Sequence, residues 1–299
     1  MSLLVVGSVA LDDIEAPAGS VRDVLGGAAC YSSVAASYFT RVLPVGVAGR
    51  DFPPEHLQFL ASKGIDVSGI ESAPGPTFRW GGRYGSSLNQ RDTLFTELGV
   101  FERFQPRLSA AQRRCGLVFL ANIHPGLQRD VLEQAARPRF TAMDSMNLWI
   151  ETAREELVAT IRKVDCLIVD EGEARLLTGE VNVVRAGESI RALGPRVGIV
   201  KRGEHGALLF DDEGVFAAPA FPLSDPADPT GAGDCFAGAF MGSLAGARRI
   251  GARALRRAMA FGTVVASFCV ERFSLDRFRS LDRSDIDARF AAYRELTRL

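Results

Sequence analysis

The residues of this chain best suited to chemistry lie between positions 228 and 240, which read Asp-Pro-Thr-Gly-Ala-Gly-Asp-Cys-Phe-Ala-Gly-Ala-Phe. This stretch joins a turn of small residues, 231–233, to the expected start of a helix. The first N–H groups of a helix have no partner within it and lie at the positive end of its dipole, so they bind anions such as phosphate. Asp234 would repel a phosphate there unless its task were to take a proton. The stretch therefore predicts a phosphate site with a general base.

This spacing resembles the second signature of the ribokinase-like (PfkB) family of carbohydrate kinases, in which the Gly-Ala-Gly-Asp run is followed, after three residues, by a small pair, here Gly238-Ala239. In that family the last Asp deprotonates a substrate hydroxyl, which attacks the γ-phosphate of ATP. The resemblance implies that Asp234 is the base. The structural alternative is a helix packed closely against a strand through small residues. The anion hole implied by the resemblance consists of the amides of Gly231, Ala232 and Gly233.

The composition is that of an ordinary globular enzyme. Hydrophobic residues make up 47% of the 299-residue chain, charged residues make up 24%, and the formal net charge is −1. This length allows one large α/β domain or two small ones. Because the net charge is near zero and the arginines are scattered among acids, we expect neither nucleic acid nor a membrane as a partner.

Cysteine and histidine usage argues against disulfides or a metal centre built from these residues. The five cysteines are odd in number and form no Cys-x-x-Cys pair, and none of the three histidines has a second ligand at metal spacing. The N-terminal apolar run is too short for a signal or membrane segment and has no basic lead. We therefore expect a cytoplasmic protein with reduced thiols.

Six short apolar runs, often β-branched, alternate with stretches of helical character. Such alternation predicts a mostly parallel sheet with helices on both faces. Ligands of such folds gather at the carboxyl ends of the strands, and polar residues such as Asp144, Asp170 and Lys201 follow three of the runs. The runs are Leu3–Val6, Val42–Val47, Leu117–Leu120, Phe140–Met143, Cys166–Val169 and Val197–Val200.

Two segments, 12–24 and 77–104, do not fit this alternation. They show strand-like patterns and glycine turns with no helix between them, so they predict a small projecting sheet. Ribokinase-like enzymes carry such a sheet as a lid over the sugar site. The resemblance thus implies one domain, residues 1–299, with a three-layer α/β/α sandwich, a mostly parallel central sheet and a β-sheet lid.

The resemblance also implies an acceptor site near the N-terminus. Asp12 follows the first strand and matches the family's Asp that binds two sugar hydroxyls, which suits a carboxylate as a double acceptor. Gly26 and Gly27 match a glycine pair that lets a helix start close to the substrate. The family commonly has Asn where this chain has Tyr31, so a phenol replaces one usual contact and the identity of the sugar stays open. Further candidate contacts in the lid are Arg83, Asn89 and Arg91.

The expected nucleotide site lies farther along the chain. Asp170 and Glu173 stand where the family has Asn-x-x-Glu, whose Glu organises magnesium waters near the phosphates; magnesium keeps several waters, so an indirect contact through Glu173 is reasonable. The alternative is an ordinary helix start, because the helix dipole favours acidic residues in the first turn and would explain the same residues. Lys201 is placed to reach a phosphate as a point charge. The resemblance adds the glycines of a nucleotide turn and two threonines: Gly203, Gly206, Thr230 and Thr263.

Taken together, these features predict an ATP- and Mg²⁺-dependent kinase of a small sugar or polyol. A nucleoside kinase of the same family is the nearest alternative, since Phe78, Trp80 and Tyr84 include rings able to stack on a base. A non-catalytic sugar- or nucleotide-binding regulator on this fold is a second alternative. A dinucleotide-dependent dehydrogenase is disfavoured because no Gly-x-Gly-x-x-Gly follows the first strand. The use of a monovalent cation and a homodimer formed through open lid edges are left open by the sequence.

Overall fold

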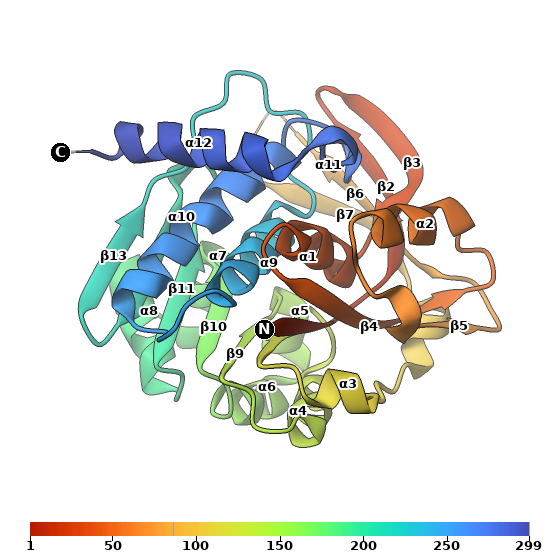
Figure 1. The fold of residues 1–299 in the computed structure, drawn as a ribbon, viewed down its shortest axis with the longest axis horizontal. Coiled ribbons are helices and arrows are strands. Elements are labelled where there is room, and N and C mark those ends of the chain that lie inside the picture. Colours follow the sequence, from red (N-terminus) through yellow and green to blue (C-terminus); the bar gives the residue numbers. More distant parts are fainter. Residues whose placement is uncertain (86, 299) are drawn as a thin grey trace.

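A large sheet forms the centre of the computed structural model, which describes residues 1–85 and 87–298. Its strands within that part of the chain are β1 (Ser2–Val6), β4 (Arg41–Gly49), β5 (Ile70–Ala73), β8 (Leu117–Leu120), β9 (Phe140–Asp144), β10 (Cys166–Asp170), β11 (Val197–Lys201), β12 (Ala207–Asp211) and β13 (Gly214–Ala218). They are ordered β13-β12-β11-β10-β9-β8-β1-β4-β5 (Figure 1). Among the described strands of this sheet, β12 pairs antiparallel with both β11 and β13, and the other neighbouring strands pair parallel, so the predicted mostly parallel sheet is confirmed.

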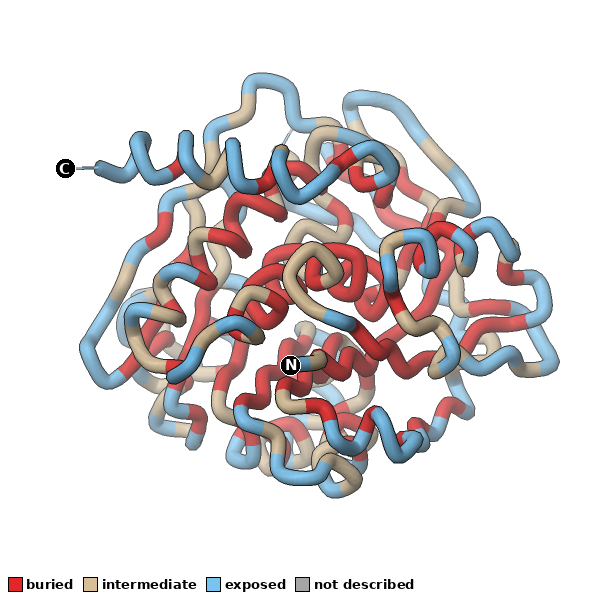
Figure 2. The backbone as a smooth tube through the Cα atoms, viewed as in Figure 1, coloured by how far each residue is buried: buried red, intermediate tan, exposed pale blue. Residues whose placement is uncertain are grey.

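Alternate residues of the central strands enter two separate cores. Leu3 and Val5 of β1 belong to one apolar cluster, and Leu4 and Val6 belong to the other. Because both faces are covered, these strands read as continuous apolar runs rather than as alternating patterns. Figure 2 shows the buried residues gathered along the centre of the molecule.

Two groups of helices build these cores. The first group contains α1 (Ala28–Ser37), α2 (Pro54–Ser62), α9 (Ala232–Leu244), α10 (Ala252–Cys269), α11 (Asp276–Ser280) and α12 (Arg283–Leu296). The second contains α4 (Pro125–Gln134), α5 (Asn147–Thr152), α6 (Arg154–Ile161), α7 (Glu171–Thr178) and α8 (Val183–Ala192), with the short α3 (Ala110–Arg113) preceding β8. The predicted three-layer arrangement is therefore confirmed. No helix in the described residues is both long and apolar enough to cross a bilayer.

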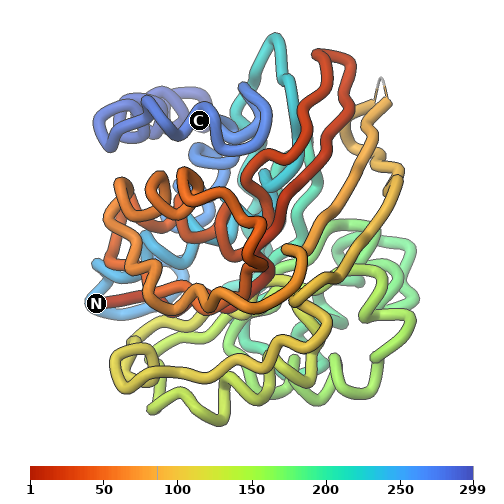
Figure 3. Tube along the Cα trace, turned by 90° about the vertical axis from the view of Figure 1, so that its right-hand side faces the viewer, coloured from red at the N-terminus to blue at the C-terminus, as the bar shows by residue number. Residues whose placement is uncertain are grey.

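A second sheet of four strands projects from the main one and corresponds to the expected lid. It consists of β2 (Ala10–Ala16), β3 (Gly19–Gly26), β6 (Phe78–Tyr84) and β7 (Arg91–Glu97) in the order β3-β2-β6-β7. Parallel pairing of β2 with β6 joins two hairpins that lie side by side in Figure 3. The segments predicted at 12–24 and 77–104 thus form the lid, although its strands begin at Ala10 and end at Glu97.

The helix that begins at the anion-binding turn packs directly on α1. A Cβ atom added to Gly238 of α9 would lie 2.1 Å from the carbonyl oxygen of Ser32 in α1, and one at Gly242 would lie 2.9 Å from that of Ala36. Only glycine allows two helix backbones to approach this closely. Gly238 therefore allows the close packing of α9 on α1.

We predict that Gly238→Ala lowers the free energy of unfolding by about 2 kcal/mol or more, because the new methyl group overpacks the contact between α1 and α9. Gly246→Ala is the matched control, since a Cβ there would meet nothing within 4 Å. Urea unfolding of both variants checks this. Equal midpoints for the two variants would contradict the packing argument.

Candidate active site

The turn that precedes α9 leaves backbone donors free at the helix start. Gly231 adopts a left-handed conformation with φ of 73°, and no side chain caps the helix. The N–H of Ala232 donates to the carbonyl of Pro229 at 3.1 Å, whereas the N–H groups of Gly233 and Asp234 bond to no described residue. Two donors at the positive end of α9 are therefore available to an anion.

A buried carboxylate holds the chain that enters this turn. Asp228 is 0% exposed; its Oδ1 accepts from the N–H of Thr230 at 2.8 Å, and its Oδ2 accepts from the N–H of Ser274 at 3.0 Å. The hydroxyls of Thr230 and Tyr84 are hydrogen-bonded at 3.2 Å, which links the turn to the lid. The first Asp of the motif is thus a structural anchor, a role that no separate sequence signal indicated.

The electrostatic environment of Asp234 suits a base. Asp234 is half-buried, and burial raises its pKa to about 6, although the positive charges of Lys201 and Arg91 act in the opposite direction. A carboxylate with such a pKa is ionised at neutral pH, yet accepts a proton more readily than an ordinary Asp.

Lys201, the last residue of β11, lies against the same turn. A Cβ atom at Gly233 would be 2.8 Å from its Nζ. Burial acts to lower the pKa of Lys201, but the carboxylates of Glu173, Asp144 and Asp234 raise it above its usual value. The ammonium group therefore remains charged beside the free amides of α9.

Asp144 completes this group of charges, and the site prediction did not include it. It ends β9, is 5% exposed, and its Oδ1 has no hydrogen-bond partner among the described residues. Burial and the neighbouring charge of Asp234 raise its pKa. The sequence signals for it were a polar residue at the carboxyl end of a predicted strand and the similarity of residues 144–149 to an Asp-Pro-Asn stretch near the nucleotide in several sugar kinases.

The predicted magnesium contact also caps a helix. Asp170 Oδ1 accepts from the N–H of Glu173 at 2.8 Å, and Glu173 Oε2 accepts from the N–H of Asp170 at 2.8 Å, so the two residues form a capping box at the start of α7. Burial, followed by the charge of Asp170, raises the pKa of Glu173 to about 7. Asp170 and Glu173 therefore serve as helix-capping residues, as the alternative of an ordinary helix start predicted.

The site fits a magnesium ion held mainly by water and phosphate. In the part of the chain that the structure describes, no three Asp, Glu, His or Cys residues are arranged to ligate a metal directly. Asp144 nevertheless has an unpaired buried oxygen, and the acids around Lys201 raise one another's pKa. A divalent cation would relieve this crowding, and magnesium commonly binds through a few carboxylates with retained waters.

Asp12 occupies space that is free because the neighbouring strand has a glycine at position 26. Asp12 is 4% exposed, and a Cβ atom at Gly26 would lie 2.1 Å from its Cγ. Gly27 has φ of 92°, and a Cβ there would lie 2.4 Å from the carbonyl oxygen of Ser8. Burial and the charges of Asp228 and Asp234 raise the pKa of Asp12. The structure therefore brings Asp12 close to the anion-binding turn.

Tyr31 supports that turn from within the protein. Its ring is 1% exposed and lies against Gly231, where a Cβ would be 2.2 Å from the ring carbon Cδ1. Its hydroxyl is buried and has no partner among the described residues. The predicted contact between this phenol and an acceptor remains a prediction.

The structure separates the predicted lid contacts. Arg83 pairs with Glu15 at 2.6 Å on the lid face opposite Asp12, because the register places Asp12 beside Trp80 and residue 15 beside residue 83. Their exposed ion pair therefore lies away from the anion-binding turn.

The other two lid residues occupy different places. Asn89 donates to Glu204 at 2.9 Å and touches Gly203, so it rests on the turn predicted to hold the nucleotide. Arg91 begins β7 and stands opposite Tyr84, on the lid face that carries Asp12. Of the three, the structure brings Arg91 to the acid cluster.

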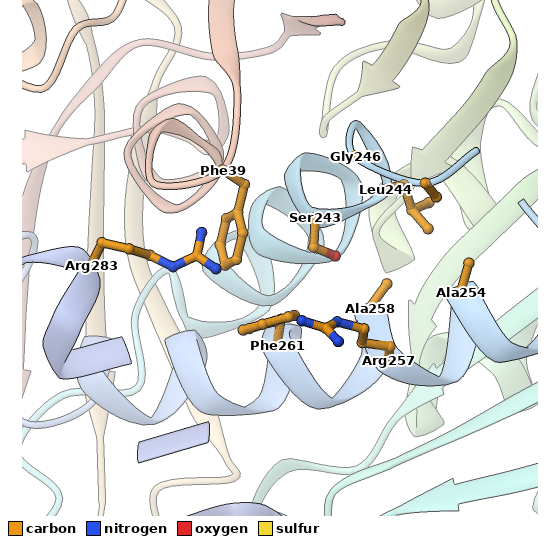
Figure 4. A pocket seen from close by; sticks show the side chains of 10 residues that line it. Phe39, Ser243, Leu244, Gly246, Ala254, Arg257, Ala258, Phe261 and Arg283 are labelled. Atoms are coloured by element: carbon orange, nitrogen blue, oxygen red, sulfur yellow. The ribbon is translucent and has the colours of Figure 1, made fainter. Parts of the chain in front are cut away.

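The predicted nucleotide turn requires its glycines. Gly203 and Gly206 have φ of 54° and 85°, and a Cβ at Gly206 would lie 2.0 Å from the carbonyl oxygen of Ala218. Thr263 is 7% exposed within α10. Its neighbour Phe261 lines a separate cavity of about 390 Å³ at the C-terminal end of α9, where Arg257 and Arg283 approach the phenyl rings (Figure 4).

Comparison with known proteins agrees with this geometry. A family model described as pfkB family carbohydrate kinase matches residues 2–279. The chain is 31% identical over 251 residues to a cytidine kinase of Thermococcus kodakarensis, covering 81% of this chain and 87% of that protein.

Solved structures share the whole fold. A nucleoside kinase of Burkholderia thailandensis in complex with inosine gives a TM-score of 0.81 at 21% identity, covering 97% of both chains. The aminoimidazole riboside kinase of Salmonella enterica, in complex with its riboside and an ATP analogue, gives a TM-score of 0.78 at 19% identity, covering 97% of this chain and 100% of that one. With its ribokinase-like fold, its lid and a match along nearly its whole length, the chain belongs to the pfkB family of carbohydrate kinases.

Proposed function

We propose that this protein transfers the γ-phosphate of ATP to a hydroxyl of a small sugar or polyol, with Asp234 as the general base. The observation that carries this proposal is the position of Asp234 at a helix start whose amides at 233 and 234 are free. The Nζ of Lys201 lies against the same turn. A base, anion-binding donors and a cation at one point are the components that phosphoryl transfer requires.

The proposed reaction proceeds in one displacement. Asp12 accepts hydrogen bonds from two acceptor hydroxyls and holds them near the turn. The carboxylate of Asp234 takes the proton of the attacking hydroxyl, the acceptor oxygen bonds to the γ-phosphorus, and the bond from that phosphorus to the β-γ bridging oxygen breaks to release ADP. The free amides of Gly233 and Asp234, together with Lys201, hold the charge of the phosphoryl group in transfer. Of the predicted anion-hole amides at 231–233, that of Ala232 is occupied by the carbonyl of Pro229.

The nucleotide binds between the carboxyl ends of β10 and β11 and the start of α9. In this proposal Gly203, Gly206, Thr230 and Thr263 line the nucleotide, and Asp170 and Glu173 hold waters of Mg²⁺. When bound together with ATP, the metal would neutralise part of the phosphate charge. A homodimer through the lid edges, β3 and β7, belongs to the same proposal.

A nucleoside acceptor is the second candidate, and the cytidine kinase and nucleoside kinase relatives favour it. Two of the lid aromatics, Phe78 and Tyr84, favour a sugar instead, because each already has a partner. Phe78 packs on Phe101 with ring centroids 5.3 Å apart, and Tyr84 bonds to Thr230. Stacking of a base on either ring would require the lid to rearrange.

We predict that Asp234→Asn lowers kcat by about 10²–10⁴-fold, because the attacking hydroxyl loses its proton acceptor. ATP affinity, measured by calorimetry, should stay near the wild-type value since the amides remain. Asp225→Asn, an exposed change in the same connection, is the matched control and should retain activity. Wild-type turnover in Asp234→Asn would remove this residue as the base.

Wild-type kcat/KM should fall as the pH drops through about 6, because protonation of Asp234, whose pKa burial raises to about 6, removes the base. A pH profile of ADP release checks this expectation. An acid limb near the ordinary Asp value of 3.8 would contradict the raised pKa.

Asp234→Asn should also make the protein more stable at neutral pH, by about 1–3 kcal/mol, because a raised pKa means that the ionised carboxylate is less favourable in the fold than in the unfolded chain. The wild-type cost appears as the pH rises above the unfolded value of 3.8 and is complete above about 6. The stability difference between the two proteins should therefore grow between pH 4 and pH 7. Thermal unfolding across this range measures it, and a constant difference would oppose the assignment.

The acceptor class is tested by ADP release over a panel of sugars, polyols and nucleosides. Turnover of sugars or polyols alone supports the first candidate, and turnover of nucleosides supports the second. Binding without turnover over the whole panel would favour a non-catalytic regulator.

A further inference from the structure

The lid presents one chemically distinctive face toward the anion-binding turn. Asp12 of β2 and Trp80 of β6 are register partners, so their side chains share a face of the sheet. Alternation along β6 puts Tyr84 on that face, and Arg91 stands opposite Tyr84 at the start of β7. The opposite face carries the ion pairs of Arg79 with Asp13 and Asp23, at 3.4 and 2.6 Å.

Trp80 and Arg91 form a stacked unit on this face. A Cβ atom at Gly82 would lie 2.0 Å from the indole Cη2 and 2.4 Å from Cζ2, so the indole edge occupies the space that a side chain at position 82 would need. The Cζ of Arg91 lies 5.2 Å from the indole centroid. Gly82 thus makes room for the indole, and the indole restricts the guanidinium through a cation–π contact.

This guanidinium is oriented but has no acidic partner. Arg91 is exposed and forms no salt bridge within the described residues, in contrast to Arg79 and Arg83 of the same lid. Its charge reaches the acid cluster, since it acts to lower the pKa of Asp234 and of Glu173 against their burial. The hydrogen bond between Tyr84 and Thr230 holds this end of the lid against the turn.

We infer that Arg91 is a further catalytic residue, which the lid brings to the phosphoryl group in transfer, and that Trp80 is a positioning residue that fixes its guanidinium. This inference rests on the proposed function. The planar guanidinium presents parallel N–H donors that match two phosphoryl oxygens, and it adds to the charge supplied by Lys201 from the sheet. Closure of the lid and completion of the catalytic charge are then one event.

The test compares four variants by steady-state kinetics and pH profiles. Arg91→Ala should lower kcat by about 10²-fold or more with a smaller change in the KM for the acceptor, because the charge acts in the transition state. Arg91→Lys should restore only part of the rate, since the ammonium group of lysine lacks the parallel N–H donors of the guanidinium. Trp80→Leu should lower kcat by about 10-fold while the arginine is still present. Arg79→Ala, a lid arginine on the opposite face, is the matched control and should keep kcat.

The pH profile separates this role from a structural one. Loss of the Arg91 charge should move the acid limb of kcat/KM to higher pH, because that charge opposes the rise in the pKa of Asp234. Arg79→Ala should leave the limb in place, and thermal unfolding confirms that each variant is folded. If Arg91→Ala kept the wild-type kcat and the wild-type acid limb of kcat/KM, the inference would be overturned. The proposed function would still stand in that case, provided that Asp234→Asn is inactive. An active Asp234→Asn would instead remove the proposed function itself.

Discussion

Crowding of carboxylates at one helix start is the constraint on which this structure depends. Burial raises the pKa of Asp12, Asp144 and Asp234, and the charge of Asp234 raises the pKa of the other two further. Among the residues that the structure describes, Lys201 and Arg91 are the cations whose charge lowers the pKa of Asp234. Such an arrangement costs stability, because charged groups out of water need partners. It is suited to a ligand that carries both phosphate and a divalent cation, since these would supply the missing partners.

The scaffold keeps this unfavourable cluster in place through close backbone packing. Gly238 lets α9 touch α1, and Gly231 lets the turn rest on the buried ring of Tyr31. Asp228 ties the chain before the turn to Ser274, which follows α10. Residues far apart in the sequence thus fix the direction of two free amide groups, so the donors are already oriented before any ligand arrives.

Much of the site was predictable from short motifs and from strand ends. The Gly-Ala-Gly-Asp turn, Lys201 and Glu173 were each expected near phosphate, and the structure brings them together. Asp144 was harder to assign because many strands end in a polar residue for the sake of the turn alone. Arg83, Asn89 and Arg91 looked equivalent in sequence. Arg91 pairs with Tyr84, the residue after Arg83 in β6, so the two arginines lie on opposite faces of the lid, whereas Asn89 lies in neither strand.

The sequence by itself determined the alternation of buried strands and helices, the existence of the lid, and the chemistry of the turn before α9, because each depends on neighbouring residues and on local backbone preferences. The antiparallel pair β12 and β13 and the edge strand β5 were not evident from local patterns. The tertiary structure alone decided which acids share a charge environment and which arginine faces them. A side chain's face depends on strand register, and an acid's pKa depends on neighbours that are distant in the chain.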